Sequence, residues 1–275
     1  MLKHKVNQLF NEQISEWKLA RDNYDALKYL RVKTLDVNGH PYKIQFNPAR
    51  IVSSSAKIDT EHISRRPCNL CRANRPSEQK GVPFGNRYIV LVNPFPIFSR
   101  HLTIADVEHT PQIIVSRFGD MLDLAEQLDD YTVFYNGPKC GASIPDHFHF
   151  QAGNKGVLPI ENDRFKYNAI CFESENRQEM IKRFREIYEN LPTPPDHPEP
   201  MLNMLTLYEI EQWTTWIFPR TKHRPACYAT HGATQLLITP GSVEMGGLFI
   251  TPLEKDFEKI TAEDIARILH EVLKL

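Results

Sequence analysis

The stretch "PDHFHFQAG", residues 145–153, holds two histidines and a glutamine at alternate positions, with a phenylalanine between each pair. Alternate residues of a β-strand point to the same face. We therefore expect His147, His149 and Gln151 on one face of a strand, and Phe148 and Phe150 packed in the core on the other. A buried polar side chain without a partner costs about 1–3 kcal/mol. The polar face is therefore an exposed edge, a metal-binding pair or part of a reactive site.

The loop in front of this strand favours the third of these alternatives. "NGPKCGAS", residues 136–143, contains two glycines together with an asparagine, a lysine and a serine. Such a loop can present backbone N–H groups and small polar side chains to an anion such as phosphate. Placed ahead of two histidines aimed at one point, it suggests phosphate chemistry with a histidine nucleophile.

A second motif lies in "RPCNLCRANRP", residues 66–76, where Cys68 and Cys71 form a CxxC pair. This spacing can hold two thiolates on one tetrahedral zinc ion. The alternatives are a redox pair, which normally opens a helix, and two unrelated buried thiols. No second CxxC follows, so we expect His109 and His147 to complete a structural Cys2His2 site. One of the paired histidines then belongs to the metal, and His149 is free for chemistry.

The overall composition is that of an ordinary globular protein. The 275 residues are 41% hydrophobic and 24% charged, with a formal net charge of −1, which gives no electrostatic case for nucleic-acid or membrane binding. No apolar run approaches the roughly 18 residues of a membrane helix, and the first 18 residues lack a continuous apolar segment, so we expect a cytoplasmic protein. An odd, sparse set of cysteines argues against a disulfide framework: Cys68, Cys71, Cys140, Cys171 and Cys227.

Hydrophobic periodicity predicts an α+β fold with an antiparallel sheet crossed by a helix. The predicted helices cover residues 1–30, 111–130, 178–191 and 261–275. The predicted strands cover 87–96, 101–109, 131–136, 147–153, 201–220, 235–241 and 246–253. The stretch "PTPPDHPEP", residues 192–200, is rich in proline and acid. It predicts a boundary between a unit at 1–192 and a second unit at 200–275.

Several stretches, taken in order, resemble one known family. They are "NPARIVSSSAKID" (47–59), "CNLC" (68–71), "NPFPIFSRHLTIADVEH" (93–109) and "FYNGPKCGASIPDHFHFQ" (134–151). Together they are similar to the histidine-triad superfamily, in the galactose-1-phosphate uridylyltransferase-like branch that includes diadenosine tetraphosphate phosphorylases and GDP-hexose phosphorylases. The tail stretch "QWTTWIFPRTKHRP" (212–225) resembles that family's second, degenerate repeat. The implied fold is a histidine-triad-like antiparallel sheet with two diverged repeats.

The resemblance implies a nucleotidyltransferase or phosphorylase that works through a covalent histidine. Its substrate would be a nucleoside diphosphate sugar or a dinucleoside polyphosphate, and its acceptor phosphate or a sugar phosphate. The hydrolase branch normally has a third histidine where this chain has Gln151, so the glutamine favours transfer. The alternatives are a hydrolase and a non-catalytic, zinc-stabilised nucleotide-binding module. A monomer and a homodimer are equally compatible.

The resemblance also assigns residues. His149 is the implied nucleophile, and Gln151 is the implied catalytic residue that contacts the phosphoryl group or the nucleotidyl intermediate. The implied ligands of a structural zinc are Cys68, Cys71, His109 and His147. The implied substrate-binding residues are Arg50, Asn136, Lys139, Gly141 and Ser143.

Two further stretches are candidates for the substrate site, and one position departs from the family pattern. "FPRTKHRP" (218–225) is either a solvated basic loop or a phosphate clamp through Arg220 and Lys222. "ITPGSVEMGGLFITP" (238–252) is expected to line the sugar or base pocket. The chain departs from the family pattern at Pro145–Asp146, where one extra residue separates Gly141 from the first histidine.

Overall fold

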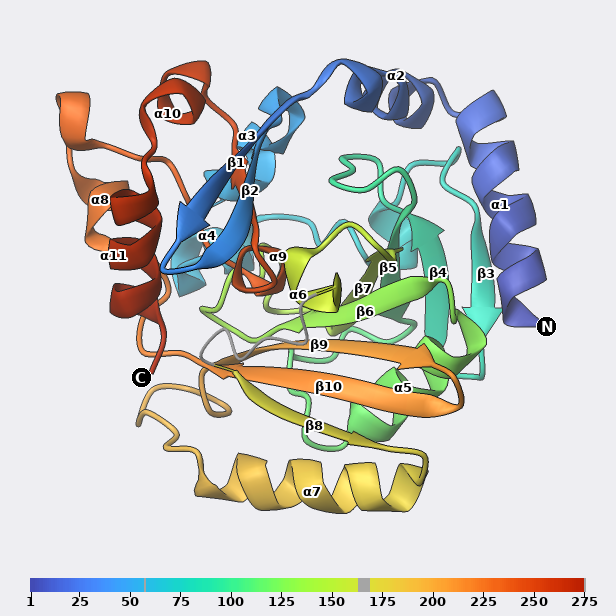
Figure 1. Cartoon of the computed structure of the whole chain (residues 1–275). Coiled ribbons are helices and arrows are strands. Elements are labelled where there is room, and N and C mark those ends of the chain that lie inside the picture. The colour runs from blue at the N-terminus through green and yellow to red at the C-terminus, as the bar shows by residue number, and fades with distance from the viewer. Residues whose placement is uncertain (57, 163–168, 275) are drawn as a thin grey trace.

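An eight-stranded antiparallel sheet forms the centre of the computed structural model, which describes residues 1–56, 58–162 and 169–274 (Figure 1). Its strands neighbour one another in the order β3-β4-β5-β7-β6-β9-β10-β8. They span Gly81–Phe84 (β3), Tyr88–Val92 (β4), His101–Asp106 (β5), Tyr131–Asn136 (β6), His149–Asn154 (β7), Ile170–Ser174 (β8), Leu202–Glu209 (β9) and Gln212–Pro219 (β10). The antiparallel α+β class expected from the sequence is therefore confirmed.

A three-stranded sheet joins the two ends of the chain. Strands β1 (Arg31–Val37) and β2 (His40–Phe46) form a hairpin, and β11 (Leu248–Thr251) adds to β2 in parallel. This parallel pair was not expected from the sequence. It brings a segment from near the C-terminus beside the segment that carries Arg50.

Helices cover both faces and the edges of the sheets. The longer ones are α1 (Leu2–Glu16), α2 (Lys18–Ala26), α5 (Phe118–Gln127), α7 (Arg177–Asn190) and α11 (Ala262–Val272). The short ones are α3 (Ile51–Ser54), α4 (Thr60–Arg65), α6 (Pro159–Asn162), α8 (Ala226–Ala229), α9 (Ser242–Met245) and α10 (Glu254–Lys259), with 3-10 turns at Leu27–Tyr29, Pro48–Arg50, Arg72–Asn74 and Gly232–Thr234. In Figure 1, α7 lies below β8, α1 stands beside β3, and α11 flanks the small sheet.

The alternation of side chains along the central strands creates two cores. On one face, Phe148, Phe150 and Tyr135 pack with residues of α1, α2, α5 and α7. On the other face, Phe134 and Trp216 pack with the small sheet and the C-terminal helices. His149 and Gln151 alternate with the phenylalanines, as predicted, and so point to the second face. His147 precedes the strand, which begins at His149.

Some predicted elements differ from the structure. The helix predicted at 111–130 begins only at Phe118, because the side chain of Gln112 and the N–H of Ile114 bond to other parts of the chain. The N-terminal helix breaks at Trp17, which is extended. Residues 235–241 form no strand, since the N–H groups of Leu236 and Leu237 bond to Cys227 and Asp256.

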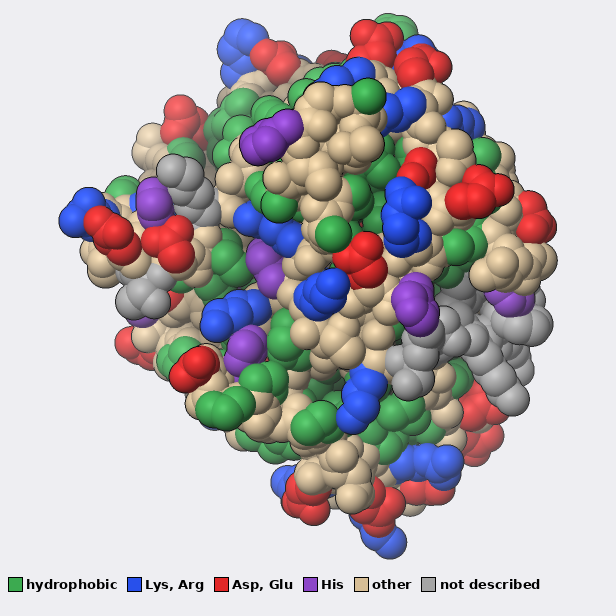
Figure 2. Space-filling model, turned by 90° about the vertical axis from the view of Figure 1, so that its left-hand side faces the viewer, with side chains coloured by type: hydrophobic (Ala, Val, Ile, Leu, Met, Phe, Trp, Pro, Cys, Tyr) green, Lys and Arg blue, Asp and Glu red, His purple; other side chains and the backbone are tan. Residues whose placement is uncertain are grey.

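The boundary predicted at 192–200 does not separate two sheets, because strands before and after it pair within the central sheet. Strand β8, before it, pairs with β10 after it, and β6 pairs with β9. Among the described residues, every helix is too short or too polar to pass through a bilayer. Basic and acidic side chains are interspersed over the face shown in Figure 2, in keeping with the near-neutral net charge.

Candidate functional site

A cavity of about 670 Å³ lies where the central sheet meets the segments around Arg50 and Glu244. Its wall combines residues from distant parts of the chain, including the ends of β6 and β7 and the loop between them. Six of the residues that the sequence predicted for the site line this cavity: Arg50, Asn136, Gly141, Ser143, His149 and Gln151.

The ring of His149 has a fixed orientation. Its Nδ1 lies 2.9 Å from the carbonyl oxygen of His147, and because a carbonyl only accepts, Nδ1 carries the proton and donates. Burial lowers the pKa of His149 to about 4, so the ring is neutral near pH 7 and its Nε2 holds a free lone pair. The contact with the His147 carbonyl therefore sets the tautomer of His149.

The backbone of His149 is held by a buried glutamine. Gln112 accepts from the N–H of His149 at 2.8 Å, and its amide nitrogen donates to the carbonyl of His149 at 2.8 Å and to that of Asn136 at 3.1 Å. Strands β6 and β7 pair only as far as Phe134 and Gln151. Beyond that point the side chain of Gln112 bridges the two diverging strands, and it places His149 beside Asn136.

Asn136 and the glycine loop form the wall next to His149. The Asn136 side-chain oxygen accepts from Asn203 Nδ2 at 2.8 Å and from the N–H of Ser242 at 2.7 Å, which directs its amide nitrogen away from those partners. Gly141 has φ +93°, and a Cβ there would lie 2.7 Å from the Cα of Gly241. Only glycine fits that combination of conformation and close approach.

An arginine and a glutamate both line the cavity. Arg50 donates to the carbonyl of Phe95 at 2.8 Å, and although burial lowers its pKa to about 10, it stays charged at neutral pH. Glu244 accepts from the N–H of Gly241 at 2.8 Å, and burial raises its pKa to about 7. The segment 238–252, which was expected to line a pocket, contributes Thr239, Gly241, Ser242, Val243, Glu244 and Ile250 to this wall.

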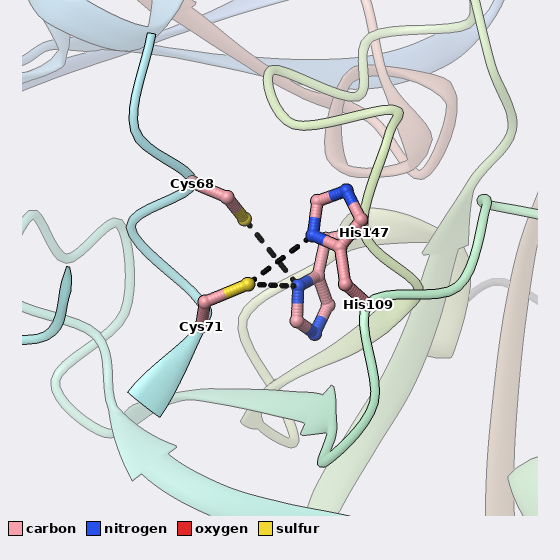
Figure 3. Close-up of side chains that lie close together, drawn as sticks. All are labelled: Cys68, Cys71, His109 and His147. Carbon is pink, nitrogen blue, oxygen red and sulfur yellow. Dashed lines mark hydrogen bonds between the residues drawn. The ribbon is translucent and has the colours of Figure 1, made fainter. Parts of the chain in front are cut away.

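Two cysteines and two histidines meet beside the cavity (Figure 3). Cys68 Sγ lies 3.3 Å from His147 Nδ1, and Cys71 Sγ lies 3.2 Å from His109 Nδ1 and 3.5 Å from His147 Nδ1. All four ligand atoms lie within 4.8 Å of one another. These separations suit four ligands on one tetrahedral ion at about 2.0–2.3 Å from each. The predicted Cys2His2 cluster therefore exists and fits a metal.

The surroundings of the cluster also suit a metal. His147 Nε2 lies 2.8 Å from the carbonyl of Asp106 and donates to it, which leaves Nδ1 unprotonated for an ion. Asp146 forms an ion pair with Arg66, and its second oxygen is 3.7 Å from His109 Nε2. Asp146, at the extra residue noted in the sequence, thus contacts both a histidine of the cluster and Arg66, which lines the cavity.

Three predicted residues lie elsewhere. Arg220 is buried, and its guanidinium donates to the carbonyls of Pro240, Lys222 and Val272 at 3.0–3.1 Å and to Asn203. Lys222 is exposed and pairs with Glu271 at 3.3 Å. Lys139 is exposed, and none of the three lines the cavity. A phosphate clamp through Arg220 and Lys222 is not supported, because protein groups already occupy the donors of Arg220.

No individual role was predicted for His101, Gln112 or Glu244. His101 lies behind the cavity wall, with Nε2 3.0 Å from the side-chain oxygen of Gln151. The sequence pattern contained a signal for His101, because His101 and Thr103 are two residues apart on a predicted strand. Two polar side chains therefore share one face of that strand. Nothing in the spacing of Gln112 points to its bridge between two strands.

These elements define a histidine-triad-like α+β fold. A crystal structure of the yeast Ap4A phosphorylase Apa2 shares it at 16% sequence identity, with a TM-score of 0.58 over 93% of this chain and 96% of that chain. The complex with AMP (16% identity) and the complex with Ap4A (17% identity) give the same TM-score over 94% and 93% of this chain and 96% of each of those chains.

The chain belongs to the DUF4922 family, a domain of unknown function, whose sequence model matches residues 9–154. No curated protein matches the sequence.

Proposed function

We propose that the protein is a nucleotidyltransferase of the phosphorylase type that works through a covalent nucleotidyl-histidine at His149. The observation that carries the proposal is the ring of His149, which is neutral, oriented by the His147 carbonyl, and part of the cavity wall. Neutral imidazole with a free Nε2 lone pair is a competent nucleophile near pH 7. The structures of the yeast enzyme with AMP and with Ap4A are nucleotide complexes of a protein with this fold, and we extend that ligand class to this chain.

The reaction has two displacements. Nε2 of His149 forms a bond to the α-phosphorus of a nucleoside diphosphate sugar or a dinucleoside polyphosphate, and the bond from that phosphorus to the bridging oxygen breaks. The leaving group departs with the bonding electrons as a sugar phosphate or a nucleoside polyphosphate. An oxygen of phosphate or of a sugar phosphate then attacks the same phosphorus and releases His149. The Nδ1–H bond to His147 stabilises the positive charge of the intermediate ring.

The other cavity residues serve the phosphoryl group. Gln151, Asn136 and the loop from Gly141 to Ser143 provide donors beside His149, and Arg50 supplies a positive charge. Donors that are fixed before the reaction stabilise developing charge on phosphoryl oxygens without reorganising. The glutamine at 151, where the hydrolases have histidine, favours phosphate over water as the acceptor.

A panel of substrates tests this function. GDP-hexoses, UDP-hexoses, ADP-hexoses and Ap4A are incubated with the protein, with and without phosphate. We expect phosphate-dependent release of a nucleoside diphosphate, and a phosphoramidate-linked nucleotide on His149 when phosphate is absent. Release that does not depend on phosphate would instead identify a hydrolase, and no turnover with labelled nucleotide bound would identify a binding module.

His149→Ala is the decisive variant. We expect loss of the covalent adduct and a fall in turnover of at least about 10³-fold, the scale seen when a nucleophile that forms the covalent intermediate is removed. Intact-mass measurement after incubation with substrate detects the adduct directly. A variant that keeps full activity would remove His149 from the nucleophile role.

We further propose zinc as the metal of the Cys2His2 cluster. Bound there, zinc contributes folding free energy and fixes the segment that leads into β7. We expect about one equivalent of zinc in the purified protein, loss of that equivalent in Cys68→Ser, and no loss in the control Cys171→Ser at an exposed cysteine. Elemental analysis measures both, and a Cys68→Ser protein that retains its zinc would contradict the site.

A further inference from the structure

Behind the cavity wall, a buried histidine contacts the side chain of Gln151. His101 is completely buried. Its ring lies edge-on to Phe98, with centroids 5.4 Å apart, and 5.9 Å from the ring centroid of Phe134. Its backbone is tied to α2, since Tyr24 donates to the His101 carbonyl at 2.9 Å and accepts from its N–H at 3.2 Å. His101 does not line the cavity, so it can act there only through a neighbour.

The hydrogen bonds of this ring determine where its proton lies. The backbone N–H of Ile97 donates to His101 Nδ1 at 3.1 Å, so Nδ1 holds a lone pair and no proton. Burial, with the positive charge of Arg50 in addition, lowers the pKa of His101 to about 3, so the ring is neutral. A neutral ring with a bare Nδ1 has its proton on Nε2. Nε2 therefore donates, and its partner 3.0 Å away is the side-chain oxygen of Gln151.

This donation settles which end of the Gln151 amide faces the cavity. The amide oxygen is held by His101, so the NH2 group takes the other direction. No other bond to this amide is found among residues 1–56, 58–162 and 169–274. Gln151 lines the cavity together with His149 and Asn136. With the amide reversed, a carbonyl-type oxygen would face the cavity and repel an anion there.

We propose that His101 is a positioning residue that holds the Gln151 amide with its NH2 group toward the cavity, ready to donate to a phosphoryl oxygen. The inference rests on the proposed function for its catalytic consequence, but not for the orientation itself. It also gives a physical reason for glutamine at this position. An amide with one end fixed offers a donor at every pH near neutrality, whereas a histidine there would exchange protons with its surroundings.

Two variants of His101 separate positioning from packing. His101→Phe keeps a ring of similar size but removes the Nε2 donor. His101→Gln retains an amide donor close to the place of Nε2. We expect His101→Phe to slow the formation of nucleotidyl-His149 by about 10- to 100-fold, the range known for side chains that orient metal ligands through a hydrogen bond. The effect should be a fall in kcat rather than a rise in KM. We expect His101→Gln to restore most of the rate.

The double variant supplies a readout that a merely structural role would not give. In Gln151→Ala there is no amide to orient, so adding His101→Phe should change the rate less than about twofold. If instead His101→Phe slows the reaction equally with and without Gln151, or if His101→Gln is as slow as His101→Phe, His101 does not act through Gln151. Melting temperature and zinc content of each variant are measured beside the rates.

A measurement on the unmodified protein does not depend on activity or on folding of the variants. Nitrogen-15 NMR of the imidazole of His101 should show a protonated Nε2 and a bare Nδ1 that do not change between pH 5 and 9. Added inorganic phosphate should shift the side-chain NH2 signals of Gln151. A proton on Nδ1, or Gln151 signals that ignore phosphate, would overturn the inference. Failure to find any nucleotidylated His149 would sink the proposed function, while the NMR result would still decide the orientation.

Discussion

Gln112 shows how much of the site depends on an uncharged side chain outside the cavity. Its amide satisfies the N–H and the carbonyl of His149 and the carbonyl of Asn136, all of them buried. For the proposed nucleophile and its neighbours, residue types, spacing and the family resemblance predicted His149, Gln151 and Asn136, which all line the cavity. The sequence could not identify Gln112 or His101, whose roles depend on which carbonyl, N–H or amide lies opposite them in the fold.

The same limit applies to Arg220. A basic stretch shows that positive charge is present, but it does not show that carbonyls of Pro240, Lys222 and Val272 already occupy the guanidinium. Within the part of the chain that the structure describes, Arg50 has one such carbonyl partner, that of Phe95, and it lines the cavity. Charge in a sequence therefore predicts a phosphate contact only where the donors remain free.

Substitution of Gln112 should affect stability and catalysis together. In Gln112→Ala, three buried backbone groups lose their partner, at about 1–3 kcal/mol for each one that stays unpaired. We expect a free energy of unfolding lower by several kcal/mol and slower nucleotidylation of His149, because the start of β7 is no longer held. Urea unfolding and single-turnover kinetics measure the two effects. Gln178→Ala, on the exposed side of α7, is the control, and equal behaviour of the two variants would contradict the role of Gln112.

Whole elements were predictable where local signals and burial agree. The helix predicted at 261–275 is α11, in which Thr261 and Asp264 form a capping box and one stripe of apolar residues is buried. Strand β6 was also placed correctly, with every residue buried. The late start of α5 at Phe118 was not predictable. Residues 111–117 have helical periodicity, yet Gln112 bonds to β6 and β7, and the N–H of Ile114 bonds to Glu199.

Glu199 links three elements through one buried carboxyl group. It accepts from the N–H of Ile114 at 2.9 Å, from Tyr135 Oη at 2.5 Å and from Tyr188 Oη at 3.4 Å, and so joins the approach to α5 with β6 and α7. Burial raises the pKa of Glu199 from 4.5 to about 7, although these donors oppose the shift. The folded protein therefore binds this proton more tightly than the unfolded chain does.

The sign of the pH dependence follows from that difference. Between pH 4.5 and about 7 the folded state holds the proton of Glu199 and the unfolded chain releases it, so the free energy of unfolding falls as pH rises. The contribution is complete below pH 4.5 and is lost above about 7, and it amounts to about 3 kcal/mol in all. Glu199→Gln should flatten this slope relative to the unmodified protein. Urea unfolding at several pH values tests it, with exposed Glu189→Gln as control; an unchanged slope in Glu199→Gln would refute the prediction.

At the scale of the whole molecule, each of the two sheets contains strands from both expected repeats. Segment 1–192 contributes β1 to β8, and segment 200–275 contributes β9 to β11. Strands of the two sets pair with each other at three places. β6 pairs with β9, β8 pairs with β10, and β11 pairs with β2. The first set cannot bury its strands alone, because without β9 one edge of β6 would lose its partner although all residues of β6 are buried. The division into two repeats therefore stays a proposal about sequence ancestry and carries no expectation of separate folding.

We accordingly expect the chain to unfold in one cooperative step. The three tryptophans allow a test in each segment, since Trp17 lies before α2 while Trp213 and Trp216 lie on β10. A variant with only Trp17 reports on the first segment, and Trp17→Phe reports on the second. In urea, the fluorescence midpoint of each variant should coincide with its own far-UV circular dichroism midpoint. Comparing each variant with itself cancels the stability change that the substitutions cause. Two midpoints, with fluorescence and circular dichroism separating in either variant, would show that the segments unfold independently.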